Sequence, residues 1–115
     1  MEVALSVQTR IVDGKPVIDV DGEMDHTGIR QFRDEVASLI DQGHRSIVLD
    51  MCHVGFMDSG GLSAIIYAMK RLESLEGCIT LAGCNDLIVR KLTIGGLTKI
   101  SDALRLAQSV EHAVS

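Results

Sequence analysis

The residues best placed to do chemistry lie in the stretch GFMDSGGLSAII, at positions 55–66. Asp58, Ser59 and two glycines stand there between an apolar run typical of a strand and an apolar run at helical spacing. Ser59 could cap the helix, attack a substrate as a nucleophile, or accept a phosphate from another protein. Backbone N–H groups and the helix dipole would stabilise an anion at this position. The local pattern favours the cap and the phosphate site about equally.

A serine hydrolase would need more than this serine. The nucleophile elbow of such enzymes is Gly-x-Ser-x-Gly, but Met57 holds the first glycine position and only Gly61 fits the second. A Ser-His-Asp relay could recruit His26, yet nothing in the sequence places that histidine against Ser59. We therefore expect a protein that is not an enzyme.

The sequence has no pattern typical of a metal or nucleotide site, and we expect neither a metal nor a cofactor. The three cysteines have no paired short spacing, the four histidines are scattered, and no phosphate-binding Gly-Lys-Ser/Thr loop is present. Cys52, Cys78 and Cys84 are set among apolar residues, which predicts reduced, buried thiols in a cytoplasmic protein. Asp19 and Asp21 are expected to be solvated charges on the outer face of a strand.

Composition argues against nucleic acid and membrane as partners. The 115 residues carry a formal net charge of -5, and only 3% of them are aromatic. Nucleic acids recruit basic patches, and single strands also need exposed rings. No apolar run approaches the roughly 18 residues of a membrane span, and the N-terminal residues do not resemble a secretory signal. We expect a single domain over residues 1–115 that is a monomer when free.

The elements that must position Ser59 alternate between strand and helix, in the order β-β-α-β-α-β-α-(β)-α. A hairpin is predicted from the alternating runs 3–8 and 17–22 and the Asp13-Gly14 turn. Further strands are predicted at 46–51 and 78–82, with a brief edge strand at 97–100. This order is typical of an α/β protein with parallel pairing in the middle of its sheet.

The predicted helices follow from apolar spacing and from capping residues at their ends. The first begins after Asp25 or Thr27 as N-cap and ends at Gly43. The second follows Ser59 and is closed by Gly77. The third is capped by Asn85 or Asp86 and runs to about Ile94. Ser101 is expected to cap a last helix that carries Leu104, Ala107 and Val114.

Three separated motifs resemble those of the STAS domain, and more narrowly those of bacterial anti-sigma-factor antagonists. They are FMDSGGL around Ser59, VDGEMDHTG at 20–28, similar to the family's Gly-Glu-x-Asp loop, and LIVRKLTIGGLTKI at 87–100, similar to its helix and Gly-Leu loop. They occur in the family's order over nearly the whole chain. The resemblance implies a STAS-like mixed sheet of four to five strands with an N-terminal hairpin and about four helices, most of them on one face.

The resemblance also implies a function in partner switching. In that family the unphosphorylated protein binds an anti-sigma factor that is a serine kinase, which frees the sigma factor. The kinase phosphorylates the serine after the motif's Asp, and a PP2C-type phosphatase reverses this. Carried onto this sequence, the phosphoacceptor is Ser59. The residues that would contact the partner are Asp25, His26, Asp58, Gly60, Gly61, Ser63, Gly95, Gly96 and Leu97.

The sequence departs from the family's pattern at two positions. The family has Ser or Thr where Gly60 stands, and Gly where Ser63 stands. Ser63 is therefore a second candidate acceptor. An alternative is a STAS module that is not an antagonist, such as a scaffold, a lipid-transport subunit or a nucleotide-sensing domain.

Overall fold

The structure is a computed structural model in which residues 5–26, 28–94, 96 and 101–115 are described. The strands are β1 (Leu5–Val12), β2 (Lys15–Met24), β3 (Ser46–Met57), β4 (Cys78–Ala82) and β5 (Leu104–Ala107). The helices of the described residues are α1 (Ile29–Asp41), α2 (Ser59–Glu73), α3 (Asp86–Ile94) and α5 (Val110–Val114).

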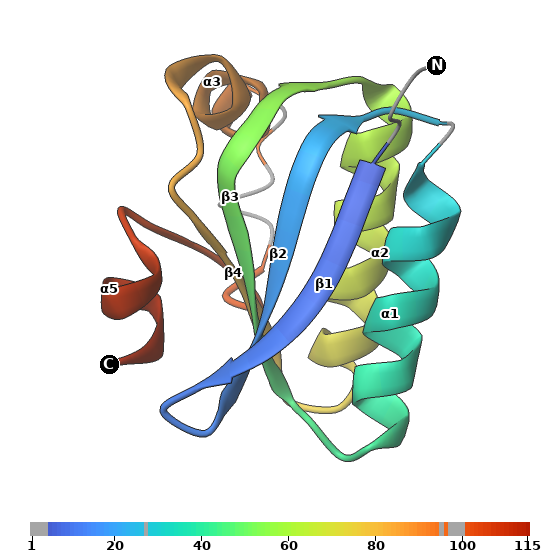
Figure 1. Cartoon of the computed structure of the whole chain (residues 1–115), viewed down its shortest axis with the longest axis vertical. Coiled ribbons are helices and arrows are strands. Elements are labelled where there is room, and N and C mark those ends of the chain that lie inside the picture. Colours follow the sequence, from blue (N-terminus) through green and yellow to red (C-terminus); the bar gives the residue numbers. More distant parts are fainter. Residues whose placement is uncertain (1–4, 27, 95, 97–100) are drawn as a thin grey trace.

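The described strands form one sheet in the order β1-β2-β3-β4-β5. β1 pairs with β2 antiparallel, and every later pair is parallel. Helices α1 and α2 lie side by side on one face of the sheet, and the short α5 lies on the other (Figure 1). These features confirm the predicted α/β fold, with its mixed sheet and N-terminal hairpin.

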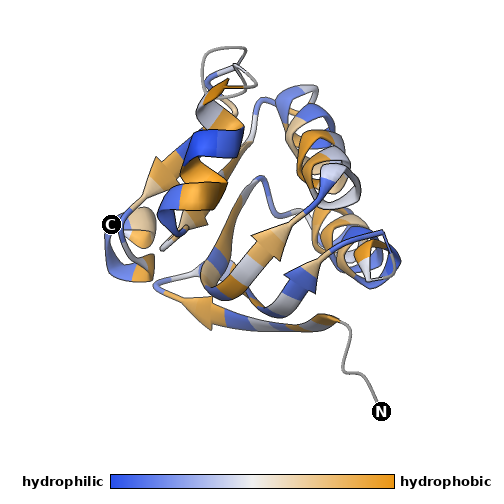
Figure 2. Cartoon of the chain, turned by 90° about the horizontal axis from the view of Figure 1, so that it is seen from above, coloured by the Kyte–Doolittle hydropathy of each residue, from blue (hydrophilic) through white to orange (hydrophobic). Residues whose placement is uncertain are grey.

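Both faces of the middle strands are buried, which explains the nearly continuous apolar run in β3. Ile47, Leu49 and Met51 face the main core under α1 and α2. Val48 faces a smaller cluster, in which Val110 of α5 covers the opposite face of the sheet. Figure 2 shows this arrangement from above, with the sheet between α5 and the pair formed by α1 and α2. A central parallel strand has this pattern because neighbours cover both of its sides.

Three of the predicted turns and caps are confirmed. Asp13 and Gly14 both have positive φ, 51° and 80°, as a two-residue hairpin turn of type I′ requires. Gly43 follows α1 with a φ of 99°, which is the left-handed ending that favours glycine. Asn85 caps α3, because its side-chain oxygen accepts a hydrogen bond from the Ile88 N–H at 2.9 Å.

Two predicted helix ends are wrong in detail. The N-cap of α1 is Gly28 and not Asp25, while Thr27 lies outside the described residues. Gly28 is required by close packing, since a Cβ there would lie 2.5 Å from the Cβ of Leu5. After α2, the left-handed residue is Glu76, with a φ of 61°. Gly77 instead lies against the segment before β3, where a Cβ would be 2.1 Å from the Arg45 carbonyl oxygen.

The prediction of one helix from Ser101 to Val114 is wrong. Leu104–Ala107 forms β5, parallel to β4, and only the short α5 follows it. The Ser101 hydroxyl accepts a hydrogen bond from the Ala103 N–H in a turn, and Ser109 is the cap of α5. The open edge of β4 offers backbone groups that a helix could not satisfy, so pairing overrides the local pattern. The edge strand expected at 97–100 lies outside the described residues.

Candidate functional site

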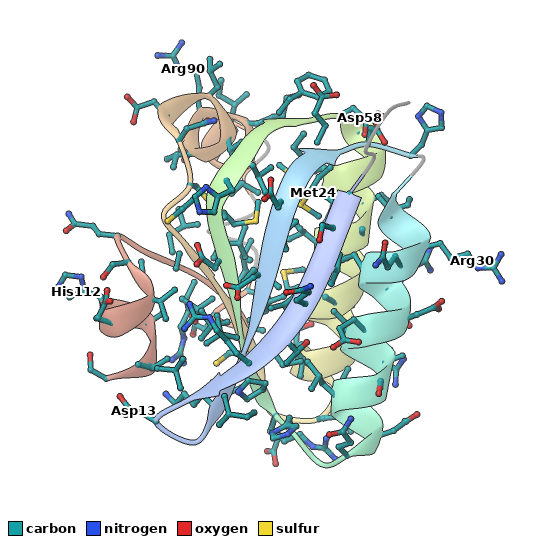
Figure 3. The ribbon with its side chains drawn as sticks, viewed as in Figure 1. Asp13, Met24, Arg30, Asp58, Arg90 and His112 are labelled. Atoms are coloured by element: carbon teal, nitrogen blue, oxygen red, sulfur yellow. The ribbon has the colours of Figure 1, made fainter. Side chains whose placement is uncertain are left out.

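The parallel pairing of β2 and β3 places two loops at the same edge of the sheet. The last pair in their register is Met24 with Met57. The residues that follow each strand, 25–28 and 58–61, therefore meet there, where α/β proteins commonly bind ligands and partners. Met24 and Asp58 lie at the upper end of these strands in Figure 3. The fold thus brings the loop of Asp25 and His26 to the motif that contains Ser59.

The two loops are joined through Asp58. Its backbone N–H donates a hydrogen bond to the Met24 carbonyl at 3.1 Å. The His26 Nδ1 atom lies 3.6 Å from Asp58 Oδ2. Asp58 is also the N-cap of α2, since its side chain accepts a hydrogen bond from the Gly61 N–H at 3.0 Å. The possibility that Ser59 is the cap is therefore wrong.

Ser59 is the first residue of α2 and its side chain is exposed. The N–H groups in the first turn of a helix lack intrahelical partners and carry a partial positive charge. A phosphate on Ser59 would meet these groups, and it would also stand next to the Asp58 carboxylate. The arrangement suits a covalently attached anion on the outside of the protein.

The two glycines after Ser59 differ in how tightly they are enclosed. A Cβ on Gly61 would lie 2.2 Å from the Met24 carbonyl oxygen and 2.7 Å from the Met57 side chain. A Cβ on Gly60 would lie 3.1 Å from the His26 backbone, which is tighter than ordinary van der Waals contact. Gly60, one of the two positions that differ from the family's pattern, thus lies where the backbone of His26 passes close to the start of α2.

The remaining predicted contact residues are only partly brought to this edge. Ser63 is exposed one turn further along α2. Gly96 follows α3 with a φ of 72°, while Gly95 and Leu97 lie outside the described residues. The structure adds Lys91, which sequence reasoning missed. Its ammonium group donates a hydrogen bond to the Met57 carbonyl at 2.5 Å, across 34 residues of chain.

The pKa of Asp58 is lowered, chiefly because the Gly61 N–H donates to its carboxylate, with smaller contributions from Gly60 and His26. A carboxyl group whose pKa is lowered by folding stabilises the protein above its ordinary value of 3.8. This stabilisation is lost as the pH falls through the lowered value.

We expect Asp58→Asn to lower the urea midpoint at pH 7, because asparagine caps the helix without the charge. The difference from the wild type should shrink below pH 3.8 and vanish once Asp58 is protonated. Urea unfolding of both proteins between pH 2 and 7 measures this difference in midpoint. Asp34→Asn, on the exposed side of α1, is the control for loss of one charge. A difference that is independent of pH would contradict this role of the carboxylate.

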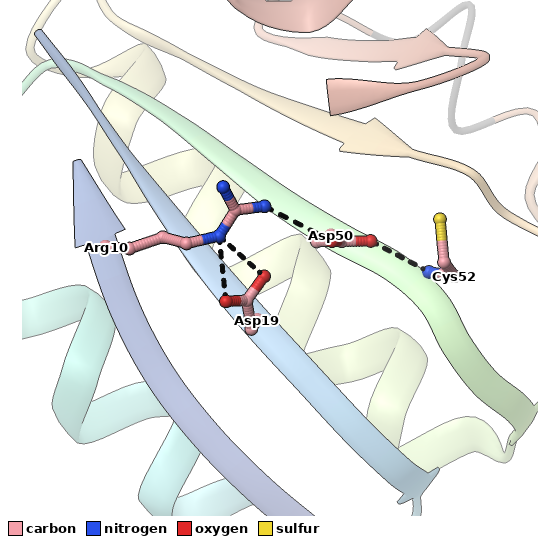
Figure 4. A network of polar contacts seen from close by, with 4 residues as sticks. All are labelled: Arg10, Asp19, Asp50 and Cys52. Carbon is pink, nitrogen blue, oxygen red and sulfur yellow. Dashed lines mark hydrogen bonds and ion pairs between the residues drawn. The ribbon is translucent and has the colours of Figure 1, made fainter. Parts of the chain in front are cut away.

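A second polar cluster lies on the sheet face opposite α1 and α2 (Figure 4). The Arg10 guanidinium pairs with Asp19 at 2.9 Å and with Asp50 at 3.6 Å. Burial opposes ionisation of Asp50, but hydrogen bonds, first of all from the Cys52 N–H, lower its pKa. The expectation that Asp19 is merely solvated is therefore wrong, whereas Asp21 is exposed as predicted.

The cysteines are free thiols, but the prediction that all three are buried is wrong. Cys52 is exposed, and Cys78 and Cys84 are half-buried. Burial raises the pKa of Cys84 to about 11. Among the described residues, no group of three or more histidine, cysteine or carboxylate side chains is arranged to hold a metal ion.

The fold and the site define a class: a small α/β protein with a mixed sheet and an exposed serine where a parallel strand meets its helix. The chain belongs to the STAS domain family, whose model matches residues 6–113. Within the described part of the chain, no helix is long and apolar enough to cross a membrane.

Curated relatives of this chain carry the name of an antagonist. The anti-sigma F factor antagonist of Lysinibacillus sphaericus is 29% identical over 82 residues, which cover 70% of each chain. The anti-sigma-B factor antagonist of Staphylococcus aureus is 27% identical over 93 residues, which cover 81% of this chain and 86% of the relative.

Solved structures share the fold. An anti-sigma factor antagonist from Mycobacterium paratuberculosis superposes with a TM-score of 0.83 at 20% identity, covering 96% of this chain and 92% of the other. The phosphorylated form of the Bacillus cell fate determinant SpoIIAA superposes with a TM-score of 0.74 at 24% identity, covering 95% and 96%.

Proposed function

We propose that this protein is an anti-sigma-factor antagonist, a single STAS domain over residues 1–115 that acts in the cytoplasm by binding and not by catalysis. Its unphosphorylated form binds an anti-sigma factor that is a serine kinase, and this releases a sigma factor. The kinase phosphorylates Ser59 and so ends the complex, and a PP2C-type phosphatase restores the active form. The names of the relatives support the antagonist function.

The observation that carries the proposal is the position of Ser59. Its side chain is exposed at the first residue of α2, directly after the capping Asp58 and beside the loop of His26. A kinase can reach the hydroxyl without unfolding the helix. The same surface is available for a partner to cover.

The charge of a phosphate explains why binding would end. A phosphoserine carries about -1.5 to -2 charges at neutral pH. At Ser59 this charge would stand next to the Asp58 carboxylate, in the middle of the proposed contact surface. A docking partner would have to remove water from this charge. That desolvation costs several kcal/mol unless the charge is paired in the complex. The switch therefore needs no rearrangement of the fold.

The contact surface proposed around Ser59 combines residues from three elements. His26 projects from the loop after β2, with its side chain 80% exposed, and Asp25 lies beside it. Gly60, Gly61 and Ser63 belong to α2. Gly95, Gly96 and Leu97 follow α3. These residues, together with Asp58, are the proposed partner contacts.

Phosphorylation with the anti-sigma kinases of the same genome tests the proposal. We expect one of them, with ATP, to phosphorylate the wild type on Ser59 and to leave Ser59→Ala unmodified, while Ser63→Ala reacts as the wild type does. Peptide mass spectrometry locates the group, and a PP2C-type phosphatase should remove it. Phosphate on Ser63 alone would overturn Ser59 as the acceptor. A wild type that none of these kinases binds or phosphorylates would overturn the antagonist function and favour a scaffold.

A further inference from the structure

An exposed apolar groove of about 330 Å³ lies between the end of β3 and helix α3. Phe56 lines it from β3, and Leu87 and Ile94 line it from α3. These three side chains are 47%, 70% and 79% exposed. Apolar residues exposed singly are common, but a group of them in one groove indicates a surface that binds something.

The groove is continuous with the site of Ser59. The Lys91 ammonium lies 5.2 Å from the centre of the Phe56 ring, which is a cation–π contact. The same group donates its hydrogen bond to the carbonyl of Met57, the residue that precedes Asp58. The groove therefore adjoins the segment that leads to Ser59, and one partner can contact both the groove and Ser59.

The groove wall formed by α3 is one face of that helix, about two turns long. Ile88 and Leu92 are its buried residues, and Ile88 reaches the floor of the groove. The exposed residues Leu87, Arg90, Lys91 and Ile94 line the groove at intervals i, i+3, i+4 and i+7. Seven residues of helix rise about 10 Å. Partners that bind as amphipathic helices commonly bury anchors with this spacing. A small ligand, by contrast, needs most of its surface enclosed, and the exposure of Leu87 and Ile94 leaves this groove open.

The charge beside the groove indicates the chemistry of its occupant. Arg90 and Lys91 border the apolar side chains and are exposed. They put two cations next to the groove in a chain whose formal net charge is -5. Complementary charge speeds docking and selects partners. The occupant should therefore combine apolar anchors with carboxylates.

We propose that the groove docks an amphipathic helix with acidic residues, presented by the kinase that phosphorylates Ser59. This inference rests on the proposed function, because it takes that kinase as the partner. The helix covers Phe56, Leu87 and Ile94 with its apolar side, and its carboxylates face Arg90 and Lys91. Docking then contributes affinity separately from the reaction at the Ser59 hydroxyl.

Steady-state phosphorylation of the full chain by this kinase tests the inference. We expect Ile94→Asp to raise the KM for Ser59 phosphorylation about tenfold or more, while kcat stays within about twofold, because docking is lost and the acceptor is intact. Ile11→Asp is the matched control. Ile11 is 60% exposed on β1, close to the hairpin turn and outside the groove, so its KM should stay at the wild-type value. Circular dichroism and thermal unfolding check that both variants fold.

A second pair of variants tests the acidic character of the occupant. Arg90→Glu should raise KM and weaken the dependence of KM on salt, whereas Arg105→Glu, on the exposed side of β5, should do neither. Equal KM values for Ile94→Asp, Ile11→Asp and the wild type would overturn the docking site and leave the proposed function intact.

The other outcomes also decide between occupants. A wild type that no kinase phosphorylates would overturn the proposed function and with it this occupant. If Ile94→Asp raises KM and Arg90→Glu does not, the proposal that the occupant is an acidic helix is wrong. If sedimentation shows that the wild type self-associates and Ile94→Asp does not, with unchanged phosphorylation, the groove instead binds a second copy of the chain.

Discussion

Replacing Ser59 with aspartate is expected to weaken binding to the anti-sigma kinase about a hundredfold, which corresponds to about 2.8 kcal/mol. The substitution puts a permanent carboxylate next to Asp58, on the exposed first residue of α2. In the complex this charge must be desolvated without a partner, and an unpaired charge at an interface costs several kcal/mol. Isothermal titration of the kinase with each variant measures the loss.

The control for this prediction adds the same charge elsewhere. Ser38→Asp introduces one carboxylate on the exposed surface of α1, near the end of that helix opposite the Ser59 edge. It should bind the kinase as the wild type does. Ser59→Ala, which adds no charge, should also keep nearly full affinity. If Ser59→Asp and Ser38→Asp bind equally well, Ser59 does not lie in the interface, and the switch we propose is wrong.

The second large effect is on stability. Gly61→Ala is expected to lower the free energy of unfolding by about 3 kcal/mol, because overpacking a tight interior typically costs 1–3 kcal/mol and occasionally more. The added Cβ would lie 2.2 Å from the Met24 carbonyl oxygen and 2.8 Å from the Met24 Cβ. Neither the backbone of β2 nor the first turn of α2 can move without disturbing the other. Urea unfolding at neutral pH measures the change.

Gly55→Ala is the matched variant for Gly61→Ala. It makes the same chemical change six positions earlier, and a Cβ there would meet nothing within 4 Å. Its effect on the free energy of unfolding should stay within about 0.5 kcal/mol, as for most surface substitutions. If the two variants unfold at the same urea concentration, the loops after β2 and β3 are not held as closely as the structure indicates.

Much of the fold follows from local pattern. The hairpin needs Asp13 and Gly14 at positive φ, and the sequence places both there. Alternation of strands and helices predicts parallel pairing, and parallel pairing predicts that the loops after β2 and β3 meet. The resemblance to the STAS domain selected Ser59 and its surroundings as the site, which stays a prediction. In the structure, His26 lies beside Asp58.

The predictions failed where contacts with a distant part of the chain determine the local structure. Leu104–Ala107 has an apolar pattern compatible with a helix, and only the open edge of β4 makes it a strand. The local pattern offers Ser59 as the cap of α2, but the cap is Asp58, whose backbone N–H is bonded to Met24 of the neighbouring strand. The spacing of α3 does not reveal that Leu87 and Ile94 are exposed whereas Ile88 is buried.

The close contact of Gly61 with Met24 and Met57 has a consequence for how long a signal lasts. A protein that switched by changing shape would return as soon as its stimulus left, because conformational exchange takes only microseconds to seconds. Here Gly61 at the start of α2 packs so closely against Met24 and Met57 that even one added Cβ would overlap both residues. Under the proposed function, the off state is therefore stored in one phosphoester bond. The protein would stay in the off state after the kinase has dissociated, until the phosphatase removes the phosphate.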